Sequence, residues 1–135
     1  MNERLEGNLH LELLLDYELR CAKRYRRYVS LIMIAPMENG VPLNEAIGGC
    51  SIRECDEYFE LDEGSVILLG ETDNSGAIVA LERFQNSANS SHDLRSSVVS
   101  FPFDGYTVYE LLSIARRRLQ KAKNMQIRGA VITTG

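Results

Sequence analysis

Two long segments of the chain place an apolar residue at every third or fourth position, which is the period of an α-helix with one buried face. The first segment covers residues 9–25, and the second runs from a capping Thr107 to about residue 124. The inward positions of the two segments are Leu11, Leu14, Leu15, Leu19 and Ala22, and then Leu111, Leu112, Ala115, Leu119 and Ala122. We therefore predict two long helices, each packed through one side.

Two further helices are predicted in the middle of the chain. Asp73 or Asn74 is a suitable cap for a helix that ends in the polar residues 86–92. One face of this helix carries Ile78, Leu81 and Phe84. Residues 42–55 are mixed and contain a short helical segment that the pair Gly48-Gly49 breaks, because glycine lowers helix stability.

Five segments are typical of β-strands. Residues 28–35 are almost wholly apolar and rich in strand-forming side chains, so we predict a central strand that is buried on both faces. Residues 56–61 and 65–69 predict two strands joined by an acidic turn that ends in glycine, a composition that favours a hairpin. Later strands are predicted at residues 96–101, which a proline follows, and at residues 127–133.

The order of these elements indicates an α/β fold, with helices packed on a central sheet of about five strands. The chain has 135 residues and a mass of 15.2 kDa, which is room for one hydrophobic core. We therefore expect a single domain over residues 1–135. Hydrophobic residues make up 44% and charged residues 25%, a balance that excludes disordered and fibrous proteins.

The sequence contains no pattern for a metal centre, a disulfide framework or a membrane anchor. The three cysteines form no CxxC pair and the two histidines are far apart, so we expect no metal and no cofactor. No apolar run approaches the ~20 residues that a membrane-spanning helix needs. The polar start of the chain lacks the apolar core of a signal peptide, and we expect a cytoplasmic protein with no membrane partner.

Basic residues gather in two clusters although the net charge is −4. These clusters are Arg20, Lys23, Arg24, Arg26 and Arg27, and Arg116, Arg117, Arg118, Lys121 and Lys123. They are consistent with contacts to nucleic acid or to a phosphate ligand, or with the solvated faces of two helices. The acidic whole and the lack of interleaved aromatic residues favour solvated faces, and we expect no nucleic acid polymer as a partner.

Three separated segments resemble the GGDEF family, the nucleotide-cyclase palm fold of bacterial cyclic-di-GMP signalling. Residues 18–31 (ELRCAKRYRRYVSL) are similar to the opening helix and first strand of that family, and residues 66–73 (VILLGETD) are similar to the strand and turn after its signature loop. Residues 100–123, with SFPFDGYT, ELL and LQKAK, resemble the closing strand, turn and long helix. The shared order and spacing of these segments imply a GGDEF-like fold.

The chain departs from the family at the residues that the resemblance assigns to catalysis. Ala35 stands where the first strand of the family ends in a metal-binding aspartate, and residues 61–65 (LDEGS) replace the Gly-Gly-Asp/Glu-Glu-Phe loop. The segment between Ala35 and Arg53 is shorter than in the family and lacks the helical part that seats the guanine base. Lys123 matches a phosphate-contacting lysine, but a solvated lysine at a helix end is the simpler interpretation. We therefore expect no cyclase activity and no metal.

The turn acids Asp62 and Glu63 are a weak alternative for that lost metal site. Carboxylates at such positions are metal ligands in principle, but acids in turns are usually only solvated. We expect both side chains to be solvated.

The resemblance also implies a second, inhibition-type site that uses an Arg-x-x-Asp motif and a helix arginine. Arg53 and Asp56 match the motif, and Arg83 matches the helix position. Two guanidinium groups and one carboxylate suit the phosphates and guanine edges of cyclic-di-GMP. The motif is nonetheless short, lies one residue closer to the following strand than in the family, and is also consistent with a local ion pair.

We thus expect a catalytically inactive GGDEF-like signalling domain that binds cyclic-di-GMP through Arg53, Asp56 and Arg83. The alternative is a protein-interaction or homodimerisation module that kept the fold and does not depend on a nucleotide. A residual cyclase is the third hypothesis.

Overall fold

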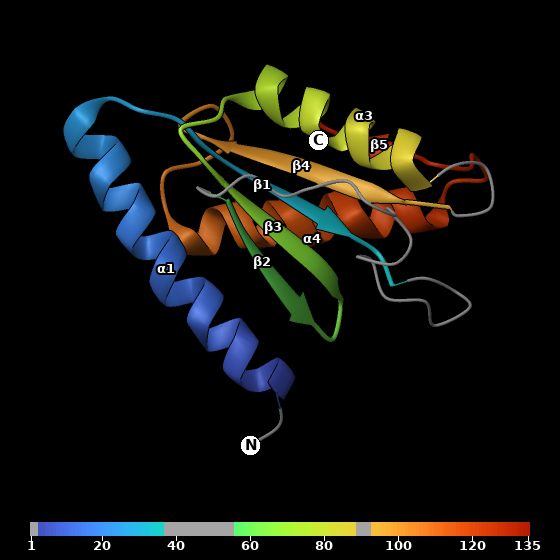
Figure 1. Ribbon diagram of the computed structural model, residues 1–135, viewed down its shortest axis with the longest axis horizontal. Coiled ribbons are helices and arrows are strands. Elements are labelled where there is room, and N and C mark those ends of the chain that lie inside the picture. Colours follow the sequence, from blue (N-terminus) through green and yellow to red (C-terminus); the bar gives the residue numbers. More distant parts are fainter. Residues whose placement is uncertain (1–2, 37–55, 89–92) are drawn as a thin grey trace.

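A mixed five-stranded sheet forms the centre of the computed structural model, which describes residues 3–36, 56–88 and 93–135. The strand order is β2-β3-β1-β4-β5, and only the β4–β5 pair is parallel (Figure 1). The strands are β1 (Val29–Ile34), β2 (Asp56–Leu61), β3 (Gly64–Gly70), β4 (Ser96–Phe101) and β5 (Val131–Ile132). The predicted α/β fold with a sheet of about five strands is therefore confirmed.

In the described part of the chain, three helices cover the two faces of this sheet (Figure 1). They are α1 (Glu3–Tyr25), α3 (Asn74–Ala88) and α4 (Val108–Asn124). Leucines of α1 and α4 share one hydrophobic cluster with one face of the strands, and α3 packs on the opposite face. The short helix predicted within residues 42–55 lies outside the described residues. No helix in the described part of the chain is long and apolar enough to cross a membrane.

The central strand β1 is buried at every position, as its apolar run predicts. Because side chains alternate along a strand, Leu31 and Met33 pack against α1 and α4 while Ile32 and Ile34 pack against α3. Its two neighbours, β3 and β4, are antiparallel to it and are also largely buried. This strand therefore joins the two halves of the core.

The helix ends show which residues act as caps. The Thr107 side chain accepts a hydrogen bond from the backbone N–H of Glu110 at 3.1 Å, so the predicted cap of α4 is confirmed. Asp73 rather than Asn74 caps α3, since its carboxylate accepts from the N–H of Gly76 at 2.8 Å. Helix α1 begins at Glu3, earlier than the predicted start at residue 9.

Two details of the sequence prediction are wrong. Leu81 and Phe84 are buried on α3 as predicted, but Ala77 rather than Ile78 completes the buried face. The last strand is shorter than residues 127–133, because only Val131–Ile132 pairs with β4.

Candidate functional site

The end of β1 meets the turn of the β2–β3 hairpin, although the two are far apart in the sequence. Gly64 has a φ of +145°, and a Cβ atom there would lie 2.2 Å from the carbonyl oxygen of Ile34 and 3.4 Å from Cα of Ala35. Ala35 is 8% exposed, and its N–H donates to the carbonyl of Arg95 at 2.9 Å. Ala35 and the turn that replaces the signature loop, two of the places where the sequence departs from the cyclase pattern, are therefore neighbours in space.

The hairpin turn is short and carries two acids. Leu61 pairs directly with Gly64, so that Asp62 and Glu63 alone form the loop between the strands. The side chain of Leu61 is buried in the core cluster below α1 and α4. An apolar residue that is anchored in the core fixes the backbone at the start of the turn.

Glu63 is paired across the structure rather than simply solvated, which corrects the sequence expectation for this turn acid. The Nε of Arg116, on α4, donates to its carboxylate at 2.8 Å. Both side chains are partly exposed, so water screens the pair and its contribution to stability is small. The ion pair instead fixes the position of the hairpin turn relative to α4, because it joins the two.

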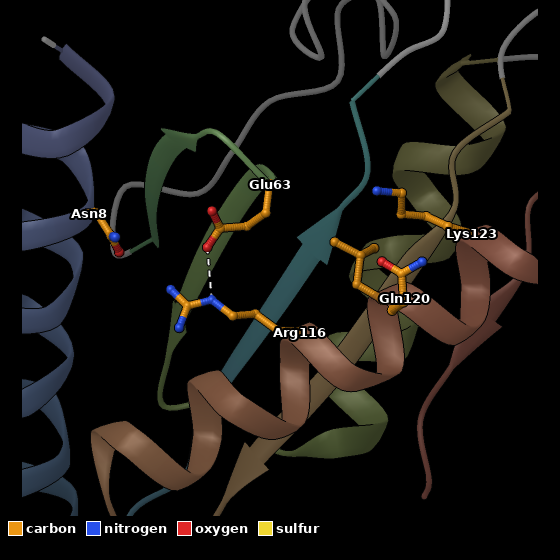
Figure 2. A pocket seen from close by; sticks show the side chains of 6 residues that line it. Asn8, Glu63, Arg116, Gln120 and Lys123 are labelled. Atoms are coloured by element: carbon orange, nitrogen blue, oxygen red, sulfur yellow. Dashed lines mark hydrogen bonds and ion pairs between the residues drawn. The ribbon is translucent and has the colours of Figure 1, made fainter.

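A pocket of about 420 Å³ lies beside this pair (Figure 2). Side chains from α1, the hairpin turn and α4 line it: Asn8, Glu63, Arg116, Leu119, Gln120 and Lys123. The Oδ1 atom of Asn8 is buried and has no hydrogen-bond partner among the described residues. Lys123 forms no ion pair within the described segments, so its positive charge in the pocket is not neutralised. The pocket can therefore accept a small anionic or polar group.

The described residues contain no group of three or more His, Cys, Asp or Glu side chains placed to hold a metal ion. Ala35 offers only a methyl group at the end of β1, and the carboxylate of Glu63 is engaged by Arg116.

The predicted cyclic-di-GMP residues are only partly visible. Arg83 lies on α3 with an exposed side chain, and its guanidinium carbon is 5.7 Å from the ring centroid of Phe84. Asp56 is the first residue of β2, and its Cα pairs with Leu69 of β3. Arg53 lies outside the described residues. The grouping of these three residues stays a prediction.

One basic residue was placed wrongly by the sequence analysis. Arg118 is buried in the interface between α4 and β4, where it donates to the carbonyl of Val98 at 2.7 Å and to Asp104 at 2.8 Å. The signal was present in the helical period, since position 118 lies three residues after Ala115 and four before Ala122. The residues Glu63, Asn8 and Gln120 of the pocket carry no comparable pattern.

Comparison with known proteins finds similar folds among solved structures only. No family model and no curated protein matches the sequence. Among solved structures, the GGDEF domain of YfiN (TpbB) from Pseudomonas aeruginosa is similar with a TM-score of 0.81 at 19% identity, over 94% of this chain and 94% of that chain. An EAL/GGDEF domain protein from M. capsulatus has a TM-score of 0.68 at 15% identity, over 100% and 99% of the two chains.

A third similar structure is the diguanylate cyclase SiaD from Pseudomonas aeruginosa, in complex with its activator SiaC. The TM-score is 0.77 at 19% identity, over 93% of this chain and 57% of SiaD. The structural likeness confirms the predicted GGDEF-like fold. At these identities it establishes the fold alone.

Proposed function

We propose that this chain is a GGDEF-like signalling domain without diguanylate cyclase activity, and that it binds cyclic-di-GMP through Arg53, Asp56 and Arg83. The observation that carries the first half is the contact of Ala35 with Gly64 at the junction of β1 and the hairpin. The resemblance implies that cyclase activity needs a metal-binding carboxylate and a loop open to phosphate at this junction. The chain has a methyl group and a closed turn there.

The chemistry of phosphoryl transfer supports the loss of activity. Transfer of a nucleotidyl group depends on metal ions that bridge the phosphates and on backbone N–H groups that approach them closely. The two-residue turn at Asp62 and Glu63 adds negative charge next to an anionic substrate, and the glycine pair is absent. The Glu63–Arg116 pair further engages one of the two carboxylates of the turn.

The exposure of Arg83 supports the second half of the proposal. Arg83 is an exposed residue of α3, and its guanidinium carbon lies 5.7 Å from the ring centroid of Phe84. Arginine binds phosphate through two parallel hydrogen bonds and stacks on purine faces, so a pair of arginines suits a cyclic dinucleotide. The carboxylate of Asp56 is suited to accept from a guanine edge.

Calorimetric titration of the purified chain with cyclic-di-GMP tests the binding. We expect saturable binding that Arg53→Ala or Arg83→Ala abolishes. Arg117→Ala is the matched control, because Arg117 is an exposed arginine on α4, away from the proposed site. If wild type gives no heat at saturating ligand, or if the control loses binding as well, the nucleotide proposal is wrong.

A separate experiment tests the absence of catalysis. The chain is incubated with GTP and magnesium or manganese, and the products are separated by chromatography. We expect no cyclic-di-GMP above the level in a protein-free sample. An amount of cyclic-di-GMP that increases with protein concentration would show that the third hypothesis, a residual cyclase, is correct.

A protein-interaction role is the second candidate, and the outer side of α1 favours it. Three apolar side chains, Leu9, Leu13 and Tyr17, are more than half exposed there. SiaD, which shares the fold, is solved with a protein activator. A complex or dimer that persists without nucleotide and in the Arg53→Ala variant would support this role.

A further inference from the structure

Helix α1 is apolar on two sides, and only one of them is covered. The covered side packs Leu11, Leu15 and Leu19 into the core. On the other side, apolar residues recur at every fourth position, and we call them the outer stripe: Leu9, Leu13, Tyr17, Cys21 and Tyr25. Four of them are between 54% and 64% exposed, and Cys21 is partly exposed. A continuous exposed apolar surface of this kind marks an interaction site.

The position of α1 leaves this stripe open. The helix lies beside β2, with which it packs, at the margin of the molecule (Figure 1). Tyr17 and Cys21 lie one helical turn apart on the stripe, as do its other members. The stripe therefore follows a single helix of 23 residues.

A row of four charged residues runs along one flank of the outer stripe. We call Glu12, Asp16, Arg20 and Arg24 the charge row; they are spaced by four residues, and all four side chains are exposed. In the direction of the chain the row reads acid, acid, base, base. Residues four apart on a helix are surface neighbours, so the row is continuous.

Read in the opposite direction, the row is base, base, acid, acid, so two antiparallel copies of it place each acid opposite a base. In an antiparallel pair of helices related by a two-fold axis, a given flank of one helix faces the same flank of the other. Glu12 then faces Arg24 of the partner subunit, and Asp16 faces Arg20 of the partner subunit. The axis repeats both pairs, so all eight charges of the two rows are matched.

A parallel pair does not offer this match. In that arrangement the charge row faces the opposite flank of the partner helix. That flank carries His10, Leu14 and Glu18, which include no lysine or arginine to balance Glu12 and Asp16. Charge complementarity therefore selects the antiparallel arrangement.

We propose that two copies of this chain associate through their outer stripes, with the two α1 helices antiparallel and the charge row setting their orientation. The partner is thus a second copy of this chain, and the surface is isologous. Within one chain, Arg20 and Asp16 already form an ion pair at 3.2 Å, but both side chains are well exposed and the pair is weak. Its groups are available to a partner subunit.

The charge row makes the dimer sensitive to salt. Exposed charges are screened over about 8 Å at physiological ionic strength and over shorter distances at higher salt. The outer stripe, by contrast, associates through apolar contact that salt does not screen. We expect dissociation to increase several-fold between low and high salt and to remain incomplete.

Two charge-reversed variants provide the decisive test. Glu12→Arg with Asp16→Arg makes the row wholly basic, and Arg20→Glu with Arg24→Glu makes it wholly acidic. Sedimentation velocity should show a wild-type dimer and, for each variant alone, dimerisation weakened by at least about tenfold. An equimolar mixture of the two variants should form a heterodimer, because a basic row then faces an acidic one.

Restored pairing in the mixture also shows that both variants are folded. Arg117→Glu with Lys121→Glu on the exposed side of α4 is the matched control and should dimerise as wild type does. Leu13→Ser, in the outer stripe, should weaken the dimer without changing the charge row. A wild type that stays monomeric, variants that dimerise as well as wild type, or a mixture that yields no heterodimer would each overturn the proposal. None of these outcomes bears on cyclic-di-GMP binding, since no nucleotide is present.

Discussion

The guanidinium of Arg118 lies 2.8 Å from the carboxylate of Asp104, and each of these side chains is only 6% exposed. Arg118 also donates to the carbonyl of Val98, and Asp104 accepts from the N–H of Ser100 at 2.8 Å. Removal of one partner leaves an uncompensated charge in the core. We expect Arg118→Met to lower the free energy of unfolding by about 3 kcal/mol, measured by urea denaturation.

The controls for this prediction separate the pair from the helix. Arg117→Met, on the exposed side of α4, should change the free energy of unfolding by less than about 1 kcal/mol. A double variant, Arg118→Met with Asp104→Asn, should be less destabilised than the sum of the two single variants, because it leaves no lone charge. Additive effects would show that the two residues do not act as a pair.

Gly64→Ala should be strongly destabilising. The φ of +145° is strained for any side chain, and the added methyl group would meet the carbonyl oxygen of Ile34 at 2.2 Å. We expect a loss of about 3 kcal/mol in the free energy of unfolding. Glu63→Ala, one residue earlier in the same turn, serves as a control and should cost less than about 1 kcal/mol, since it removes only a partly exposed ion pair. Equal losses in the two variants would contradict the contact with β1 as the cause.

The fold could be predicted from the sequence because its strongest signals are local. The wholly apolar run at β1, the helical period of α4 and the acid-rich hairpin turn each correspond to one element. The similarity of segments in the right order then sufficed to identify the GGDEF-like fold. No step in this inference needed the position of a side chain in space.

The site was harder to predict because its contacts are long-range. Glu63 and Arg116 are 53 positions apart, and no sequence pattern connects an acid in a turn with one arginine among several on a helix. Arg118 is a different case, because its helical position did indicate burial and its charge led to the opposite expectation. A buried arginine requires a partner, and Asp104 lies outside the helix that the period describes.

Short elements were also mispredicted, for a physical reason. Strand β5 pairs only with Ser96 and Ser97 of β4, although β4 itself continues to Phe101. Before the strand, the carbonyl of Ala130 accepts from the N–H of Ser96 at 2.9 Å, and the N–H of Gly129 donates to the side chain of Asp93 at 2.6 Å instead of to a strand. Propensity alone does not set the length of an edge strand.

Tyr58 should make the stability of the domain depend on pH in the alkaline range. Burial raises the pKa of its phenol to about 12, and its hydroxyl donates to Glu60 at 2.7 Å. In the unfolded chain the pKa of tyrosine is about 10. The folded pKa is the higher one, so this contribution is fully present below pH 10 and is lost as the pH rises towards 12.

Tyr58→Phe tests this dependence. The variant should lose less stability than wild type when urea unfolding is compared at neutral pH and at about pH 11. Tyr109→Phe, at an exposed position on α4, is the control and should follow wild type. A parallel loss of stability in wild type and Tyr58→Phe would show that another group titrates.

Ala35→Asp restores the missing carboxylate at the end of β1, and we expect it not to restore cyclase activity. The substituted position is 8% exposed and packs against the backbone of Gly64, so a charge there is desolvated. We expect the free energy of unfolding of Ala35→Asp to be about 2 kcal/mol lower than that of Ala35→Asn, which carries the neutral isostere of aspartate. Magnesium should not raise the melting temperature of Ala35→Asp, because Glu63 stays paired with Arg116. Incubation with GTP and magnesium should therefore yield no cyclic-di-GMP from either variant. Product or metal stabilisation in Ala35→Asp alone would mean that the carboxylate is the single missing part, and that the closed hairpin is no barrier to catalysis.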